Sequence, residues 1–138
     1  MRAPDALFSS LVAAMLFLAA CATPVSPTVT MNRGPSLSAD SMIYLSVRVE
    51  RERIAQSLQD AGFTTTARLA DAQYTLEVTA GRSRRGTSCG HVRNVSYILT
   101  DRAQRVMAIK GRGLTGSCVP NIFDAMSREL ASQTGIGG

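Results

Sequence analysis

Apolar residues recur along the chain in two different periods, with polar residues between them. A period of two indicates a β-strand with one buried face, and a spacing of three to four residues indicates an amphipathic helix. The predicted strands cover residues 41–47, 63–67, 74–81, 91–100 and 106–113. The predicted helices cover residues 49–61 and 121–132.

Both predicted helices carry end signals. Gly62 follows the first helix, where a glycine commonly ends a helix. Asn121 precedes the second helix as a capping residue, and Asp124 lies in its first turn. The order β-α-β-β-β-β-α predicts an α+β fold, a two-layer sandwich with two helices on one face of a mainly antiparallel sheet of about four to five strands.

The beginning of the chain has neither period. Residues 6–20 form an apolar run that is shorter than the roughly 20 residues of a membrane-spanning helix but suits the central region of a secretory signal. The run ends in Leu18-Ala19-Ala20-Cys21, which resembles the lipobox of bacterial lipoproteins. The resemblance implies that 1–20 is a signal peptide and that Cys21 receives diacylglycerol and palmitate-like acyl chains. An ordinary signal-peptidase site at the same place is the alternative.

Several acyl chains on Cys21 would hold the protein firmly on a membrane, whereas a single chain binds only marginally. Residue 22 is Ala and not Asp, which by resemblance to a known lipoprotein sorting rule favours the periplasmic face of the outer membrane. The inner membrane remains the alternative location. Residues 21–40 are rich in Pro, Ser and Thr and are predicted to be a tether. They would lead to a periplasmic domain at 41–134 and a frayed tail at 135–138.

Two further cysteines, Cys89 and Cys118, flank the predicted hairpin of 91–100 and 106–113. They would lie close together across its open end, and an oxidising periplasm would join them in a disulfide. One strand register places the two cysteines directly opposite each other. A second register pairs Tyr97 with Ile109 and so matches the apolar faces better. A single β-bulge would reconcile the two, and the sequence does not choose between them.

The same cysteines allow a chemical alternative. Cys89, His91 and Cys118 could supply metal ligands or a thiol beside an imidazole. Zinc motifs usually show tighter paired spacing, however, and the chain carries neither a Ser/His/Asp signature nor a phosphate-binding glycine loop. We therefore expect no enzymatic activity, no cofactor and no metal.

Charge supplies the remaining signal. The formal net charge is +5, and basic residues gather between positions 82 and 112. Arginine forks suit phosphate and carboxylate oxygens, and the polyanions of a cell envelope are glycolipids and acidic glycans rather than nucleic acid. The alternative is a solvated basic surface. The candidate anion-binding residues are Arg82, Arg84, Arg85, Arg93, Lys110 and Arg112.

A lipobox, a tether and a small α/β sandwich occur here together with Ala70-Asp71 and the alternating strand at 74–78. This arrangement resembles small outer-membrane assembly lipoproteins, the lipopolysaccharide-assembly lipoprotein family in particular. The disulfide has no counterpart that we can match in that family. The resemblance implies a non-enzymatic, lipid-anchored assembly or scaffold protein that binds an envelope protein, and an anionic glycolipid or glycan. A regulator of a peptidoglycan synthase has a similar layout and is the alternative, followed by a small thiol or metal protein.

Overall fold

The computed structural model describes residues 26–34, 37–83 and 85–136. The predicted signal peptide 1–20, the lipidation residue Cys21 and the candidate Arg84 lie outside the described residues. The strands are β1 (Thr28–Asn32), β2 (Met42–Ser46), β3 (Thr64–Thr66), β4 (Tyr74–Ala80), β5 (Arg85–Gly86), β6 (His91–Asp101) and β7 (Gln104–Leu114). The helices are α2 (Arg51–Asp60) and α3 (Ile122–Thr134), with a short 3-10 turn, η1, at Leu69–Asp71.

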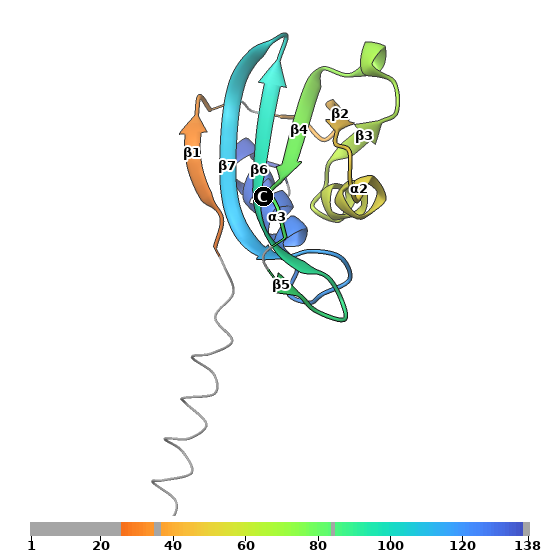
Figure 1. Cartoon of the computed structure of the whole chain (residues 1–138). Helices are drawn as coiled ribbons and strands as arrows, with labels where there is room; N and C mark the ends of the chain where they lie inside the picture. The colour runs from red at the N-terminus through yellow and green to blue at the C-terminus, as the bar shows by residue number, and fades with distance from the viewer. Residues whose placement is uncertain (1–25, 35–36, 84, 137–138) are drawn as a thin grey trace, which may run out of the picture.

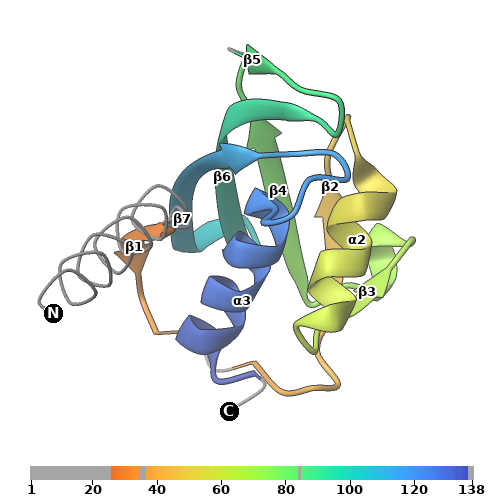
Figure 2. The ribbon, with the colours of Figure 1, turned by 90° about the horizontal axis from the view of Figure 1, so that it is seen from below.

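Six strands form one open sheet in the order β1-β7-β6-β4-β2-β3, and β5 adds to β6 outside this row (Figure 1). The pairs β1–β7, β7–β6 and β6–β4 are antiparallel. The pairs β4–β2 and β2–β3 are parallel. Helices α2 and α3 lie side by side on one face of this sheet (Figure 2). The other face carries no helix in the described part of the chain.

The predicted α+β fold with two helices beside a sheet is therefore confirmed, but the sheet is larger and more mixed than predicted. The parallel part follows from the unit β2-α2-β3, because a helix that crosses over a sheet returns the chain in the same direction. Strand β4 then pairs with the other side of β2, also in parallel. The local patterns locate these strands, but they do not specify their order in the sheet.

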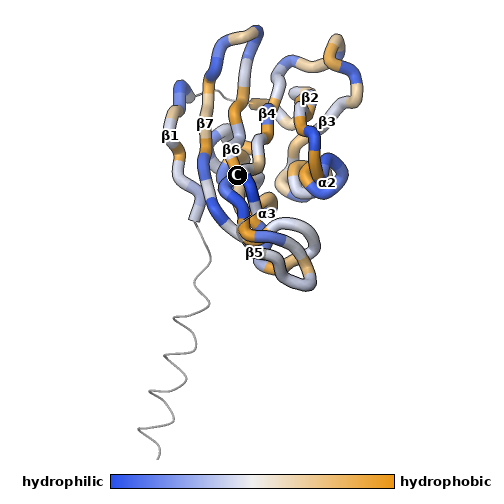
Figure 3. Tube along the Cα trace, in the orientation of Figure 1, coloured by the Kyte–Doolittle hydropathy of each residue, from blue (hydrophilic) through white to orange (hydrophobic). Residues whose placement is uncertain are grey.

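The core lies between the helices and the sheet. Figure 3 marks the hydrophobic residues of the strands and helices in orange along the chain trace. The apolar positions that define the sequence periods are buried there, in agreement with the prediction. The largest fully buried side chains are Tyr97, Phe123, Ile43, Ile54, Leu58, Leu76, Leu99, Met107, Ile109, Met126, Leu130 and Val95.

Strand β1 lies within the segment that the sequence predicts to be a tether, and the prediction is wrong for these residues. Val29 and Met31 are half-buried, and Val29 packs against the core from the edge of the sheet beside β7. The alternation of apolar and polar residues in β1 is short, and the many Pro, Ser and Thr residues around it make the segment look like a tether by composition. Backbone hydrogen bonding to β7 orders the segment, although its side chains bury little apolar surface.

The folded region also extends beyond both predicted limits of 41 and 134. Leu37 and Ile136 are buried, and the Leu37 amide donates a hydrogen bond to the Thr134 carbonyl at 3.1 Å. Ile136 follows Gly135, which adopts a left-handed conformation and ends α3. Ile136 thus belongs to the core, and residues 135 and 136 are not a frayed tail.

The hairpin of β6 and β7 adopts the register that matches the apolar faces. Tyr97 lies opposite Ile109, Leu99 lies opposite Met107, and this register continues to the Val92–Leu114 pair. The two cysteines lie in loops beyond the ladder.

A bulge does interrupt the hairpin, but it lies near the turn and not on the side of the cysteines. It falls between Leu99 and Thr100 and leaves Arg102 and Ala103 as a two-residue turn. Both turn residues have positive φ, at 45° and 68°, as a type I′ hairpin turn requires.

Polar groups fasten α2 to α3 above the core. Arg53 donates two hydrogen bonds to the Asp124 carboxylate, at 3.0 and 2.7 Å. Deeper in the interface the Ser57 and Ser127 hydroxyls are 2.9 Å apart, and the Tyr97 hydroxyl lies 3.2 Å from that of Ser127. The hydrogen bond to Asp124 raises the pKa of Arg53 further, so the Arg53 guanidinium stays charged.

We expect Tyr97 to make the fold sensitive to alkali. Burial raises the pKa of Tyr97 to about 12. An unfolded tyrosine ionises near pH 10, so its contribution is fully present below about pH 10 and is lost as the pH approaches 12. The expected loss is about 1.4 kcal/mol per pH unit in that window. Urea unfolding at several pH values measures it, and Tyr97→Phe should flatten the slope.

The matched control for this experiment is Tyr44→Phe, which removes a half-buried phenol that lies outside the core. This variant should retain the alkaline loss of the parent. An unchanged slope in Tyr97→Phe would contradict the assignment.

Candidate functional site

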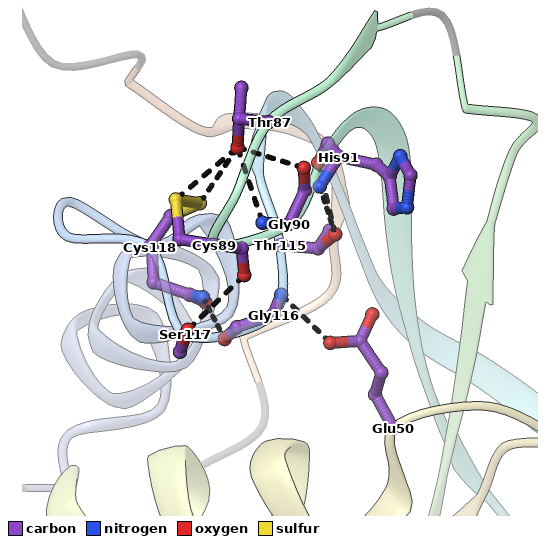
Figure 4. The surroundings of a disulfide bond; sticks show 10 residues. Glu50, Thr87, Cys89, Gly90, His91, Thr115, Gly116, Ser117 and Cys118 are labelled. Atoms are coloured by element: carbon purple, nitrogen blue, oxygen red, sulfur yellow. Dashed lines mark hydrogen bonds between the residues drawn. A yellow bond between two sulfur atoms is a disulfide. The ribbon is translucent and has the colours of Figure 1, made fainter.

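A disulfide joins the two loops at the lower end of the hairpin, as the sequence predicts. Cys89 precedes β6, Cys118 lies between β7 and α3, and their Cα atoms are 4.9 Å apart. The Ser117 amide donates to the Cys89 carbonyl at 2.9 Å, and Glu50 accepts a 2.8 Å hydrogen bond from the Gly116 amide (Figure 4). The disulfide loop is thereby tied to the residue that precedes α2.

The alternative of a thiol or metal site uses the same residues. Because each sulfur is bonded to the other, neither Cys89 nor Cys118 is a free thiol or thiolate in this structure. His91 lies at the start of β6 and is exposed. Over residues 26–34, 37–83 and 85–136, no three His, Cys, Asp or Glu side chains gather in a geometry that could hold a metal ion.

The structure describes five of the six predicted anion-binding residues and divides them between different parts of the molecule. Lys110 and Arg112 lie two residues apart on β7, so their side chains point to the same face of the sheet. On β6, Ser96 lies opposite Lys110 and Asn94 lies opposite Arg112. Ile109, between them and the turn, is buried under the helices, so Lys110 and Arg112 point to the uncovered face of the sheet. We call this pair the open-face cations.

The glycines beside Arg112 have a packing role. A Cβ atom added to Gly111 would lie 2.9 Å from the Met126 sulfur, and one added to Gly113 would lie 3.2 Å from Ile122. Both positions face α3, and their lack of a side chain lets the helix approach β7 closely. In the sequence Gly111-Arg112-Gly113, the two glycines therefore lie under α3, and the Arg112 side chain points to the opposite face of the sheet.

The remaining predicted residues lie apart from the open-face cations. Arg82 is exposed in the loop after β4, and Arg85 belongs to β5. Arg93 has the same strand parity as the buried Val95, so it points to the helix side of the sheet. The five described residues consequently do not form one continuous site.

Arg93 instead lines a cavity of about 520 Å³ beside the end of β4. Ser46 is the last residue of β2 that pairs with β4, opposite Glu77. Beyond this pair the chain leaves the sheet and enters α2, whereas β4 continues to Ala80 without a partner on that side. The cavity forms in the gap and is lined by Ser46, Val47, Arg48, Val49, Arg51, Glu77, Val78, Thr79, Ala80 and Arg93.

The cavity holds three guanidinium groups and a single carboxylate, that of Glu77. Arg51 is anchored by hydrogen bonds from its guanidinium to the Leu45 and Val47 carbonyls, at 2.7 and 3.2 Å. The two ion pairs in the described part of the chain lie elsewhere and use Arg53 and Arg68. The cavity is thus positively charged.

Arg93 is the most enclosed of the three. Its guanidinium donates one long hydrogen bond, of 3.4 Å, to the Gly81 carbonyl. Its Nε atom is buried and has no hydrogen-bond partner in the described part of the chain. Buried polar atoms in native proteins are nearly always paired, so this donor marks a place where an acceptor would be favourable.

Sequence reasoning found Arg93 but missed Arg48 and Arg51. Arg48 immediately precedes the predicted helix 49–61, and Arg51 lies in its first turn. Both are far in sequence from the basic run at 82–112. No sequence spacing joins them to Arg93. Only the parallel pairing of β2 with β4, together with the antiparallel pairing of β4 with β6, brings the three together.

Comparisons with known proteins reach only the level of the fold. No protein-family model matches the chain, and no curated protein matches it. A solved structure of PelC from Paraburkholderia phytofirmans, a dodecamer, aligns with a TM-score of 0.55 over 81% of this chain and 99% of that chain, with 17% identity. A dodecamer of a single-residue PelC variant from the same organism aligns with a TM-score of 0.55 over 80% and 98%, with 16% identity. At such identities the likeness establishes a shared fold.

None of the helices in the described part of the chain is both long enough and apolar enough to cross a membrane.

Proposed function

We propose that the protein is a lipid-anchored protein of the bacterial cell envelope that acts, without enzymatic activity, as an assembly or partner-binding module. It would be held at the periplasmic face of the outer membrane by acylated Cys21, and its domain would contact an envelope protein and an anionic glycolipid or glycan. The observation that carries the proposal is the uncovered sheet face with the open-face cations Lys110 and Arg112. A face that no helix covers is available for a partner.

The disulfide supports the proposed compartment. Disulfides form and persist in exported proteins and are rare in the reducing cytosol. The pairing of Cys89 with Cys118 leaves Cys21 as the third cysteine of the chain. One lipidated cysteine and one disulfide together account for the odd number of cysteines in the chain.

The solved structures of similar fold support an assembly role. Both PelC structures are dodecamers. Because the described fold ends in two open sheet edges, at β1 and β3, strand pairing between copies is sterically accessible in this architecture. We therefore include self-association among the forms that the assembly role can take.

The proposed polyanion contact is tested with a double variant of the open-face cations. Full-length protein in a non-ionic detergent is titrated with deacylated, phosphorylated lipopolysaccharide oligosaccharide. Lys110→Gln with Arg112→Gln should weaken binding by about tenfold at low salt and reduce its salt dependence, because two exposed charge pairs contribute about 0.2–1 kcal/mol each.

A matched control removes the same charge at positions away from Lys110 and Arg112. Arg105 is exposed near the hairpin turn and Arg128 is exposed on α3. Arg105→Gln with Arg128→Gln should leave binding nearly unchanged. Equal losses in the two double variants would show that only net charge matters, and the open face would then have no specific role.

A further inference from the structure

We propose that the cavity between β4 and the connection from β2 to α2 is a binding site for an acidic sugar. The carboxylate or phosphate of the sugar would bind to Arg48, Arg51 and Arg93, and its hydroxyl groups would bind to the polar residues beside them. This site lies beside the end of β4, whereas the open-face cations lie on β7, which is separated from β4 by β6. The proposal does not rest on the lipid anchor.

The charge balance of the cavity selects an anion. Three guanidinium groups and one carboxylate line it, which leaves an excess of two positive charges. Arginine presents its N–H groups in a planar fork that matches the oxygens of carboxylates and phosphates. Arg51 is already held by two backbone carbonyls, so its guanidinium is positioned before any ligand binds.

The buried Nε atom of Arg93 supplies a second, independent observation. A buried donor without an acceptor costs free energy, and the cost is larger for a charged group. Arg93 lies in the cavity wall, and its one hydrogen bond, to Gly81, is long. A bound anion would offset this cost by pairing with the Arg93 guanidinium, whereas a neutral apolar ligand would not.

The polar residues of the wall select a ligand that also carries hydroxyl groups. Ser46 and Thr79 contribute hydroxyls, and the Glu77 carboxylate is an acceptor without an ion-pair partner in the described part of the chain. The unpaired edge of β4 beyond Glu77 adds backbone donors and acceptors. A simple inorganic anion would leave these groups unused.

The volume of the cavity agrees with a small ligand. Sites for small molecules enclose about 300–1,000 Å³, and this cavity of about 520 Å³ falls inside that range. The cavity therefore suits one or a few sugar units rather than a long chain.

The experiment titrates four probes into full-length protein, in a non-ionic detergent that contains no sugar, and follows binding by calorimetry. The probes are methyl glucuronide, glucose 1-phosphate, neutral methyl glucoside and inorganic phosphate. At least one of the two acidic sugars should bind at least tenfold more tightly than methyl glucoside and inorganic phosphate. A preference for methyl glucuronide would identify a carboxylate ligand, and a preference for glucose 1-phosphate would identify a phosphate ligand.

Variants then locate the binding. Arg93→Gln removes the enclosed cation, and Arg48→Gln removes an exposed one whose loss should not affect folding. Each should weaken binding of the preferred acidic sugar by about tenfold, since hydrogen bonds to charged groups are stronger than those between neutral groups. Arg105→Gln, which lies outside the cavity, is the matched control and should bind like the parent.

Three results would overturn the proposal. The first is an absence of binding by both acidic sugars. The second is binding of methyl glucoside or inorganic phosphate as tightly as the acidic sugars. The third is unchanged binding in Arg48→Gln, which stays informative even if Arg93→Gln does not fold. None of these results depends on acylation of Cys21, so failure here and failure of the envelope proposal can be told apart.

Discussion

Replacing Cys21 with Ser is expected to abolish the incorporation of labelled palmitate and to release the protein from the membrane fraction. Acyl transfer requires the thiol, and a serine hydroxyl cannot replace it in this chemistry. Each buried methylene contributes about 0.8 kcal/mol to membrane binding, so the loss of several chains removes the anchor completely. Cells grown with radiolabelled palmitate, followed by fractionation and immunoprecipitation, provide the measurement.

The control for this prediction replaces the other cysteines. Cys89→Ser with Cys118→Ser removes the disulfide but leaves Cys21 intact, so palmitate should still be incorporated. The lipoprotein proposal is wrong if Cys21→Ser is labelled as strongly as the parent, or if the double variant loses the label instead.

Loss of the disulfide is expected to be the largest single change in the stability of the domain. The bond closes a loop with a sequence separation of 29 residues. For a loop of this length the chain-entropy model gives about 3–4 kcal/mol. Cys89→Ala and Cys118→Ala should each lower the free energy of unfolding by about 2–4 kcal/mol in urea denaturation.

The double variant separates a disulfide from two independent cysteines. Both single changes break the same bond, so Cys89→Ala with Cys118→Ala should cost little more than either alone. Ser117→Ala is a matched control in the same loop, because it removes only the 3.2 Å hydrogen bond from its hydroxyl to the Cys89 carbonyl. Losses that add fully in the double variant would contradict the disulfide as their common cause.

The sequence predicts most elements of this fold because their apolar residues follow one period over enough positions. The helices, four of the five predicted strands and the hairpin lie within a few residues of their expected limits, and the short β3 lies inside the fifth. The hairpin register follows the better apolar match, with Tyr97 opposite Ile109. The position of its bulge does not follow from that match, because it depends on the positive φ values of Arg102 and Ala103.

Other features depend on contacts that no local pattern encodes. Strand β1 has too few apolar residues to stand out, and it is ordered by pairing with β7, which is remote in sequence. Likewise, the cationic cavity exists because β2 ends before β4 does, which brings Arg48 and Arg51 toward Arg93. The basic run at 82–112 suggested a single surface, but alternation along β6 and β7 sends Arg93 and Lys110 to opposite faces.

The most direct test of the envelope proposal is the mass of the N-terminal peptide of the mature protein, purified from washed outer membranes. We predict a chain that begins at Cys21 and whose first residue carries a thioether-linked diacylglycerol, with a further acyl chain on its amino group. An unmodified Cys21, or a mature chain that begins at any other residue, would contradict the proposal.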